Sequence, residues 1–213
     1  MLIRSRGADP VVDPSVFVAP TSALVGRVRV AARARVMYGA VLDAEGSRVE
    51  VGECTIVCEN AVLRATAEGE REQPVELADH VFVGPHATLL GCRVEPCAYL
   101  ATGATVLHGA VIGSGAVVAV GALVHANTVV PGGLFVPPNA VAVGDPVRVF
   151  GPPDADALAE AIRSVGFASS AFNVQTAWED RVARYREAAE VRSREFGAHH
   201  DDTRLDAEGG KPR

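Results

Sequence analysis

Aromatic residues are scarce in this sequence of 213 residues: they make up 5% of it and include a single Trp. The hydrophobic fraction is nevertheless 48%, so Val, Leu, Ile and Ala must fill the interior, and a large core built on aromatic rings is excluded. Low-complexity disorder is excluded too, because such segments lack the apolar surface that offsets the entropy of an ordered chain. The length suits one domain with an appendage.

Long runs of positive charge and long apolar runs are also missing. The formal net charge is -6, and no stretch of Lys and Arg would supply the basic face with which a protein displaces counterions from nucleic acid. No segment approaches the roughly 20 uninterrupted apolar residues that span a bilayer, and residues 1–6 lack the apolar stretch of a signal peptide. The sequence therefore predicts a cytoplasmic protein without nucleic-acid or membrane partners.

The four cysteines, Cys54, Cys58, Cys92 and Cys97, do not form CxxC pairs. Their spacings, CxxxC and CxxxxC, differ from those of zinc ribbons and redox loops. We predict reduced cysteines that act as small buried hydrophobes rather than as a metal site.

Aliphatic residues recur every six positions along much of the chain, and the longest unbroken run comprises Val94, Leu100, Val106, Ile112, Val118, Val124, Val130 and Val136. On an α-helix a six-residue step rotates a side chain by about 600°, so these residues would leave a common face. The period fits a triangular coil with three hexapeptide sides and about 18 residues per circuit. The sequence therefore predicts a mainly β fold of stacked coils, in which residues 18 positions apart line the same wall.

Two stretches, 44–48 and 65–74, interrupt the period, and we expect the second, which is polar and acidic, to form a loop that protrudes from a corner. The repeat ends near Pro152, and Asp154 is placed to cap a helix that runs to about Ser164. A second helix is predicted over 174–195, because apolar residues there form a stripe at helical spacing: Trp178, Val182, Tyr185 and Ala189.

These patterns divide the chain into a β-helix domain over residues 1–152, a helical segment over 153–196 and a disordered tail over 197–213. We expect the helical stripe to pack on the β-helix or on a neighbouring copy of the chain.

Several short segments stand in order along residues 11–150: Val18-Ala19-Pro20, Gly39-Ala40-Val41-Leu42, Val51-Gly52, Glu59-Asn60-Ala61-Val62-Leu63, Gly91-Cys92 and Val143-Gly144-Asp145-Pro146. Together with the repeat, they resemble the gamma-class carbonic anhydrase-like proteins of the hexapeptide-repeat superfamily. The resemblance implies a left-handed parallel β-helix with C-terminal α-helices. It also implies a homotrimer, with zinc held by three histidines in the cleft between neighbouring prisms.

At the three positions where the resemblance implies histidines, this chain has Arg64, Pro85 and Leu90. Arginine does not deprotonate to become a ligand, and proline and leucine have no side-chain donor. A zinc ion that activates water needs three such donors and an open position. We therefore predict no metal site and no cofactor. His86 lies one residue from an implied ligand position, and only a local bulge would turn it inward to join a non-standard metal site.

We predict instead that the intersubunit cleft binds or transforms a small anionic molecule. A guanidinium suits a carboxylate or phosphate, so Arg64 is the candidate that orients it. The candidate catalytic residues are Glu45, Glu59 and His86, and the candidate substrate-binding residues are Arg64, Asp43 and Cys58. An alternative left open is that Arg64 forms a salt bridge that merely fills the vacant metal site.

Two other functions remain open. The segments Pro131-Gly132-Gly133 and Val136-Pro137-Pro138-Asn139 resemble the last coils of CoA-dependent acyltransferases of the same superfamily, for which His86, His108 or His125 would be the base. A noncatalytic trimeric scaffold needs no chemistry at the altered site, and its C-terminal helices would make the contacts. Whether the protein is an enzyme is left undecided by the sequence.

Overall fold

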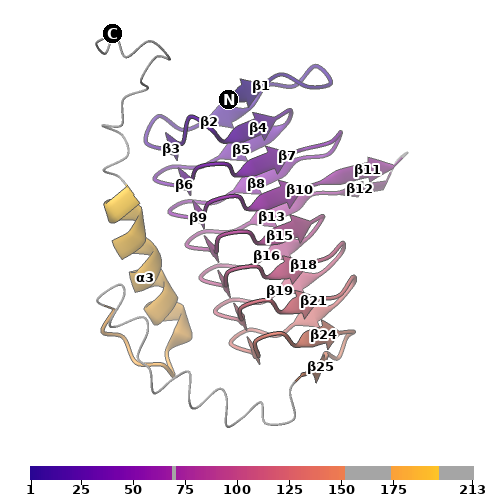
Figure 1. The fold of residues 1–213 in the computed structure, drawn as a ribbon, viewed down its shortest axis with the longest axis vertical. Helices are drawn as coiled ribbons and strands as arrows, with labels where there is room; N and C mark the ends of the chain where they lie inside the picture. Colours follow the sequence, from indigo (N-terminus) through magenta and orange to yellow (C-terminus); the bar gives the residue numbers. More distant parts are fainter. Residues whose placement is uncertain (69–70, 152–173, 197–213) are drawn as a thin grey trace.

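Strands of two or three residues alternate with tight turns along most of this chain, whose computed structural model describes residues 1–68, 71–151 and 174–196. The strands stack into a triangular prism, a left-handed parallel β-helix, with α3 (Arg181–Phe196) alongside it (Figure 1). The three sheets are named here wall 1, wall 2 and wall 3.

Wall 1 has nine strands, in the order β1 (Leu2–Ile3), β4 (Ala23–Val25), β7 (Val41–Asp43), β10 (Val62–Arg64), β15 (Thr88–Leu90), β18 (Thr105–Val106), β21 (Leu123–Val124), β24 (Val141–Val143) and β25 (Arg148–Phe150). Wall 2 has seven strands: β2 (Val11–Val12), β5 (Val28–Val30), β8 (Val49–Val51), β13 (Val75–Leu77), β16 (Arg93–Val94), β19 (Val111–Ile112) and β22 (Val129–Val130). Wall 3 also has seven: β3 (Phe17–Val18), β6 (Arg35–Val36), β9 (Ile56–Val57), β14 (Phe82–Val83), β17 (Tyr99–Leu100), β20 (Val117–Val118) and β23 (Phe135–Val136). Neighbours in these walls pair in parallel except β24 and β25.

The six-residue period is confirmed as the inward side of the walls. Val94, Ile112 and Val130 pair in register on wall 2, and Leu100 pairs with Val118 on wall 3. These five residues are at most 1% exposed. Strands of a wall are about 4.8 Å apart, so each aliphatic side chain packs on its equivalents in the coils before and after it. The narrow interior explains why aliphatic residues replace aromatic ones in this core.

The interruption at 65–74 protrudes from the corner between wall 1 and wall 2, as expected, but most of it is a hairpin rather than an irregular loop. The strands β11 (Thr66–Glu68) and β12 (Arg71–Gln73) pair antiparallel and project away from the prism on the side opposite α3 (Figure 1). Backbone pairing within the insertion satisfies polar groups that the coil cannot reach.

The helix α3 begins at Arg181, seven residues later than the sequence predicts. Asp180 is the N-cap residue of this helix, because its carboxylate accepts a hydrogen bond from the N–H of Ala183 at 3.0 Å. The chain before the cap turns back, and the Glu187 carboxylate accepts hydrogen bonds from the N–H groups of Gln175 and Thr176, each at 3.0 Å. The helix predicted over 154–164 and the tail 197–213 lie outside the described residues.

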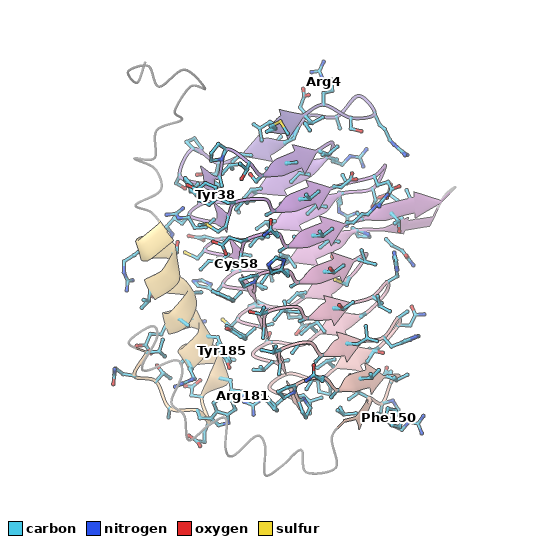
Figure 2. All side chains as sticks on the ribbon, in the orientation of Figure 1. Arg4, Tyr38, Cys58, Phe150, Arg181 and Tyr185 are labelled. Carbon is cyan, nitrogen blue, oxygen red and sulfur yellow. The ribbon has the colours of Figure 1, made fainter. Side chains whose placement is uncertain are left out.

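Two residues of the predicted stripe, Tyr185 and Ala189, are buried where α3 packs on the outer side of wall 3, whereas Val182 is 39% exposed. Tyr185 faces this wall (Figure 2), and its ring stacks on that of Tyr99 with 4.9 Å between ring centroids. Near the other end of the helix, buried Arg35 donates from Nε to the carbonyl of Ser193 at 3.1 Å. A cation at this end complements the partial negative charge of the helix C-terminus. No helix in the described part of the chain is long and apolar enough to cross a membrane.

Candidate functional site

The outer surfaces of the three walls differ in chemistry. Wall 3 lies under α3, whereas wall 2 carries a row of charged residues in register: Arg29, Glu50, Glu76 and Arg93. The outward residues of wall 1 are mostly half-buried and apolar or small, and one row of them comprises Ala23, Val41, Val62, Thr88, Thr105, Leu123 and Val141. Wall 1 is therefore the face that can associate with another apolar surface.

Arg64 ends β10 on wall 1 and pairs in register with Asp43 on one side and with Leu90 on the other. These three residues thus stand side by side on neighbouring coils, about 4.8 Å apart. Two of the three positions where the resemblance implies zinc ligands, 64 and 90, therefore do lie together in this chain. The side chain of Arg64 is 50% exposed, so it is accessible from outside the wall.

The Arg64 guanidinium pairs with Glu45, which lies in the turn after β7. Its Nε donates to Glu45 Oε2 at 2.5 Å, and Asp43 Oδ1 accepts a hydrogen bond from the Glu45 N–H at 2.9 Å. The hydrogen bond from Arg64 lowers the pKa of Glu45, and the nearby positive charges of Arg64 and Arg6 act in the same direction. Glu45 is thereby held as a carboxylate, which makes it a weak proton acceptor in this state.

Glu59 and His86 lie at a different corner, between wall 3 and wall 1. The His86 N–H donates to the Glu59 carbonyl at 2.9 Å, and the imidazole is exposed. His86 precedes β15 by two residues, whereas Leu90 ends it, so about 13 Å separates them along the strand. The chain therefore does not bring its own Glu59 and His86 together with Arg64. His86 keeps a regular corner position, with φ 59°, rather than forming a bulge that turns it inward.

Cys58 belongs to neither group. It is 3% exposed and packs in an apolar cluster with Met37, Ile56 and Phe82 on wall 3 (Figure 2). The four cysteines are buried and form no disulfide, as the sequence predicts, and burial raises the pKa of the Cys92 thiol to about 12. A buried neutral thiol is a poor nucleophile, so the placement of Cys58 does not favour a substrate-binding role.

The residues at the implied ligand positions do not fit a zinc ion. Arg64 and Leu90 offer no lone pair to a metal, and Pro85 precedes β15 at the opposite end of wall 1. Within the described ranges, no group of three or more His, Cys, Asp and Glu residues is arranged to hold a metal ion. Of the other histidines named as candidate bases, His108 is half-buried beside Gly91, whose N–H donates to the Arg64 carbonyl at 3.0 Å. His125 is exposed.

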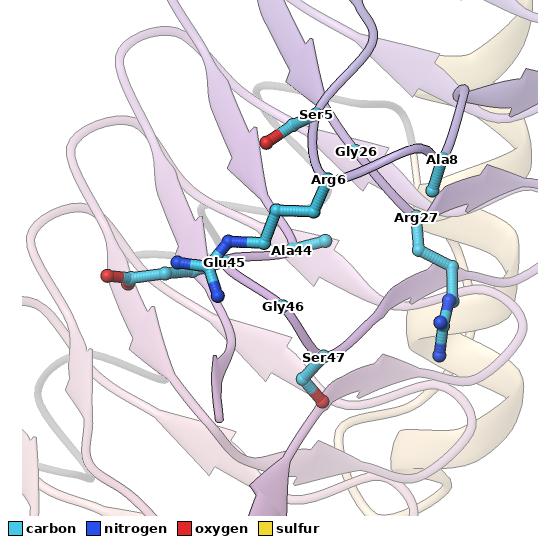
Figure 3. A pocket seen from close by; sticks show the side chains of 9 residues that line it. All are labelled: Ser5, Arg6, Ala8, Gly26, Arg27, Ala44, Glu45, Gly46 and Ser47. Atoms are coloured by element: carbon cyan, nitrogen blue, oxygen red, sulfur yellow. The ribbon is translucent and has the colours of Figure 1, made fainter. Parts of the chain in front are cut away.

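Sequence reasoning missed two arginines near this site. Arg6 and Arg27 line a pocket next to Glu45 (Figure 3). Neither belongs to the repeat or to the segments that carry the resemblance. The signal that points to them is the pair Arg6-Gly7, which favours a left-handed turn before the first complete coil.

No protein-family model matches the chain. It is 36% identical over 104 residues to gamma carbonic anhydrase 2, mitochondrial, of Arabidopsis thaliana, a match that covers 48% of this chain and 37% of the relative. Gamma carbonic anhydrase 3, mitochondrial, of the same plant is 40% identical over 98 residues, covering 45% of this chain and 38% of the relative. The matches thus span less than two fifths of the length of these relatives. The cytoplasmic location that the sequence predicts stays a prediction.

Among solved structures, a putative acetyltransferase of Bacillus cereus is similar with a TM-score of 0.51 and 23% identity, over 87% of this chain and 96% of that one. At this identity the likeness concerns the fold alone and gives no support to acyl transfer. On these comparisons the chain has a β-helix fold built on a six-residue repeat, and about half of its length is homologous to gamma carbonic anhydrases.

Proposed function

We propose that three copies of this chain associate across wall 1 and bind a small anionic molecule in the clefts between them, with Arg64 as the anion-binding group and without zinc. The observation that carries the proposal is the division of the implied ligand positions. Arg64 and Leu90 stand side by side at one end of wall 1, whereas Pro85 lies at the other end. One chain cannot join the three positions, but the end of one wall 1 and the corner of a neighbouring copy can.

The outer surface of wall 1 supports association. Half-buried Val41, Val62 and Leu123 project from it, and they lie in one row with Thr88 and Thr105. When another copy covers this apolar row, association is favoured by about 25 cal/mol for each Å² of apolar surface removed from water. The trimeric state itself comes from the resemblance.

The Arg64 guanidinium keeps donors for a ligand. Only its Nε is used by Glu45, and no acceptor in the described residues receives a hydrogen bond from its two terminal NH2 groups. The two terminal groups together form a planar fork with which arginine binds carboxylates and phosphates. The salt bridge to Glu45 therefore orients Arg64 without using up its capacity to bind an anion.

In this arrangement the corner of a neighbouring copy supplies Glu59 and His86 to the cleft. Both side chains are accessible enough to reach a molecule bound by Arg64, since His86 is exposed and Glu59 is half-buried. A neutral imidazole has one nitrogen that donates a hydrogen bond and one that accepts, so it can pass a proton to or from a bound molecule. His86 is accordingly the group we propose for proton transfer, and Glu45 and Asp43 are positioning residues that hold Arg64.

The test combines elemental analysis with native mass spectrometry of the purified full chain. We expect trimers, no stoichiometric zinc, and a bound small anion that is lost in the variant Arg64→Gln. The control is Arg93→Gln, which removes the same charge from the exposed side of wall 2 and should keep both the trimer and the anion. A monomeric protein, tightly held zinc, or an Arg64→Gln variant that retains the anion would refute the proposal.

A further inference from the structure

A pocket of about 150 Å³ lies where the first turn of the chain meets the corner between wall 1 and wall 2 (Figure 3). Residues Ser5 to Ala8 form the turn, which two backbone hydrogen bonds of 3.0 Å close, from Ser5 N to the Ala8 carbonyl and from Ala8 N to the Ser5 carbonyl. The pocket is far smaller than the roughly 300 Å³ at which sites for drug-sized ligands begin, so it suits a small ion.

The backbone places the Arg6 side chain over this corner. Arg6 and Gly7 have φ angles of 50° and 78°, and this pair of left-handed residues directs Arg6 back toward the coil. Gly46 leaves the room that the guanidinium occupies, because a Cβ atom on Gly46 would lie 2.6 Å from Arg6 Nη1. Figure 3 shows the Arg6 side chain running beside Ala44 toward Glu45.

The lining carries more positive than negative charge. Arg6 and Arg27 both line the pocket, and neither forms an ion pair within 4.0 Å with any residue of the described ranges. Glu45 is the acidic residue of the lining, and its carboxylate is already paired with Arg64. Arg6 lies near the Glu45 carboxylate but forms no ion pair with it, so both guanidinium groups keep hydrogen-bond donors beside a small polar pocket.

We infer that this pocket is a binding site for a small inorganic oxyanion, sulfate or phosphate, with Arg6 and Arg27 as its charged donors. Guanidinium groups bind such oxyanions with charge-assisted hydrogen bonds, and the Ser5 hydroxyl on the pocket wall adds a neutral donor. The site uses neither Arg64 nor a neighbouring copy of the chain. It is therefore distinct from the cleft proposed above, although Glu45 borders both.

Isothermal titration of the full chain with sodium sulfate at low ionic strength tests the site, with sodium chloride as the reference salt. We expect one sulfate per chain, and at least tenfold weaker binding in both Arg6→Gln and Arg27→Gln. Gln at position 6 meets the same left-handed backbone as Arg, so the turn is preserved. The matched control is Arg29→Gln. Arg29 is an exposed arginine of β5 on wall 2, so this variant should bind sulfate as the wild type does.

Two further variants separate the pocket from the cleft. Glu45→Gln removes the negative charge of the lining and should tighten sulfate binding severalfold. Arg64→Gln leaves Glu45 unpaired and should weaken it by less than tenfold. The inference is overturned if Arg29→Gln weakens binding as much as Arg6→Gln does, since overall charge would then explain it. It is overturned equally if Arg64→Gln abolishes sulfate binding while Arg6→Gln and Arg27→Gln retain it.

Discussion

A left-handed residue occupies the tip of the corner between wall 3 and wall 1 in successive coils, at Gly39, Asn60, His86, Gly103, Gly121 and Asn139. Their φ angles lie between 55° and 73°, a region in which glycine is unstrained and asparagine is tolerated. Gly113 differs from these corner residues, because it lacks a positive φ and instead lets two coils approach closely.

The contrast between Gly113 and Gly103 gives a prediction on stability. A Cβ atom on Gly113 would lie 2.4 Å from the backbone nitrogen of Gly132, which cannot move without disturbing the next coil, whereas one on Gly103 would meet nothing within 4 Å. We expect Gly113→Ala to lower the free energy of unfolding by about 3 kcal/mol. Gly103→Asn should change it by less than about 0.5 kcal/mol, because asparagine already occupies equivalent corners. Denaturant unfolding measures both, and equal losses would contradict this account.

The pair of Glu45 and Arg64 predicts a dependence of stability on pH. Because the hydrogen bond from Arg64 lowers the pKa of Glu45 in the folded state, the folded protein binds this proton less readily than the unfolded chain. The stabilising effect is therefore fully present above the ordinary pKa of glutamate and disappears as the pH falls through the lowered value. We expect the wild type to be more stable than Glu45→Gln at pH 7, with the difference shrinking as the pH falls below the ordinary pKa of glutamate.

Thermal unfolding of the two proteins across this pH range is the measurement. The control Glu50→Gln alters an exposed carboxylate on wall 2 and should not reproduce the trend. A stability difference that persists unchanged at pH 3 would show that Glu45 acts through something other than its charge.

At the scale of elements, the repeat was predictable because burial imposes it at every coil. A shift of register by one residue would turn Val94 or Ile112 outward, so an aliphatic residue is needed at every sixth position. The period therefore predicts the three walls directly. The start of α3 was less predictable than its end, because Trp178 continues the helical stripe although the chain there is not helical. Asp180 caps the helix, and the Glu187 carboxylate accepts hydrogen bonds from the backbone N–H groups of Gln175 and Thr176 before it. A periodic pattern of apolar residues does not reveal these contacts.

The docking of α3 on wall 3 depends on the ring of Tyr185, which is 7% exposed and stacks on Tyr99. Tyr185→Ala removes this contact and should weaken docking by about 3 kcal/mol, which corresponds to a roughly hundredfold loss of hydrogen-exchange protection in α3. Val182 lies on the same helix but is 39% exposed, so Val182→Ala is the matched control and should change protection little. Equal loosening by both variants would mean that the stacked rings do not anchor the helix.

At the scale of the whole molecule, the sequence predicted part of the candidate site. Asp43, Glu45 and Arg64 do lie together, because neighbouring coils place residues of equal register side by side. Glu59 and His86 do not join them within one chain. The six-residue spacing predicts the wall on which a residue lies, but it does not predict which residues of a neighbouring copy lie opposite it. The pocket at Arg6 depends on how a turn folds back onto a corner, and no repeat describes that.

The divided ligand positions lead to a prediction for the assembly. If wall 1 of one copy faces the corner of the next, the triple variant Arg64→His, Pro85→His and Leu90→His brings three imidazoles from two chains to one point. Three neutral nitrogen ligands are a sufficient set for Zn²⁺ with one open position. We expect this variant to retain one zinc per chain through gel filtration, and zinc to raise the melting temperature of the trimer by binding only the assembled state.

The double variant Arg64→His and Leu90→His is the control, because it offers only the two neighbouring imidazoles of a single wall and should lose zinc on the same column. Elemental analysis and light scattering of the eluted proteins decide the outcome. Zinc retained by a monomeric triple variant would show that one chain gathers all three positions, against the spacing of β15. A trimer whose triple variant holds no zinc would show that the copies meet through a surface other than wall 1, and the proposed cleft would then have to be abandoned.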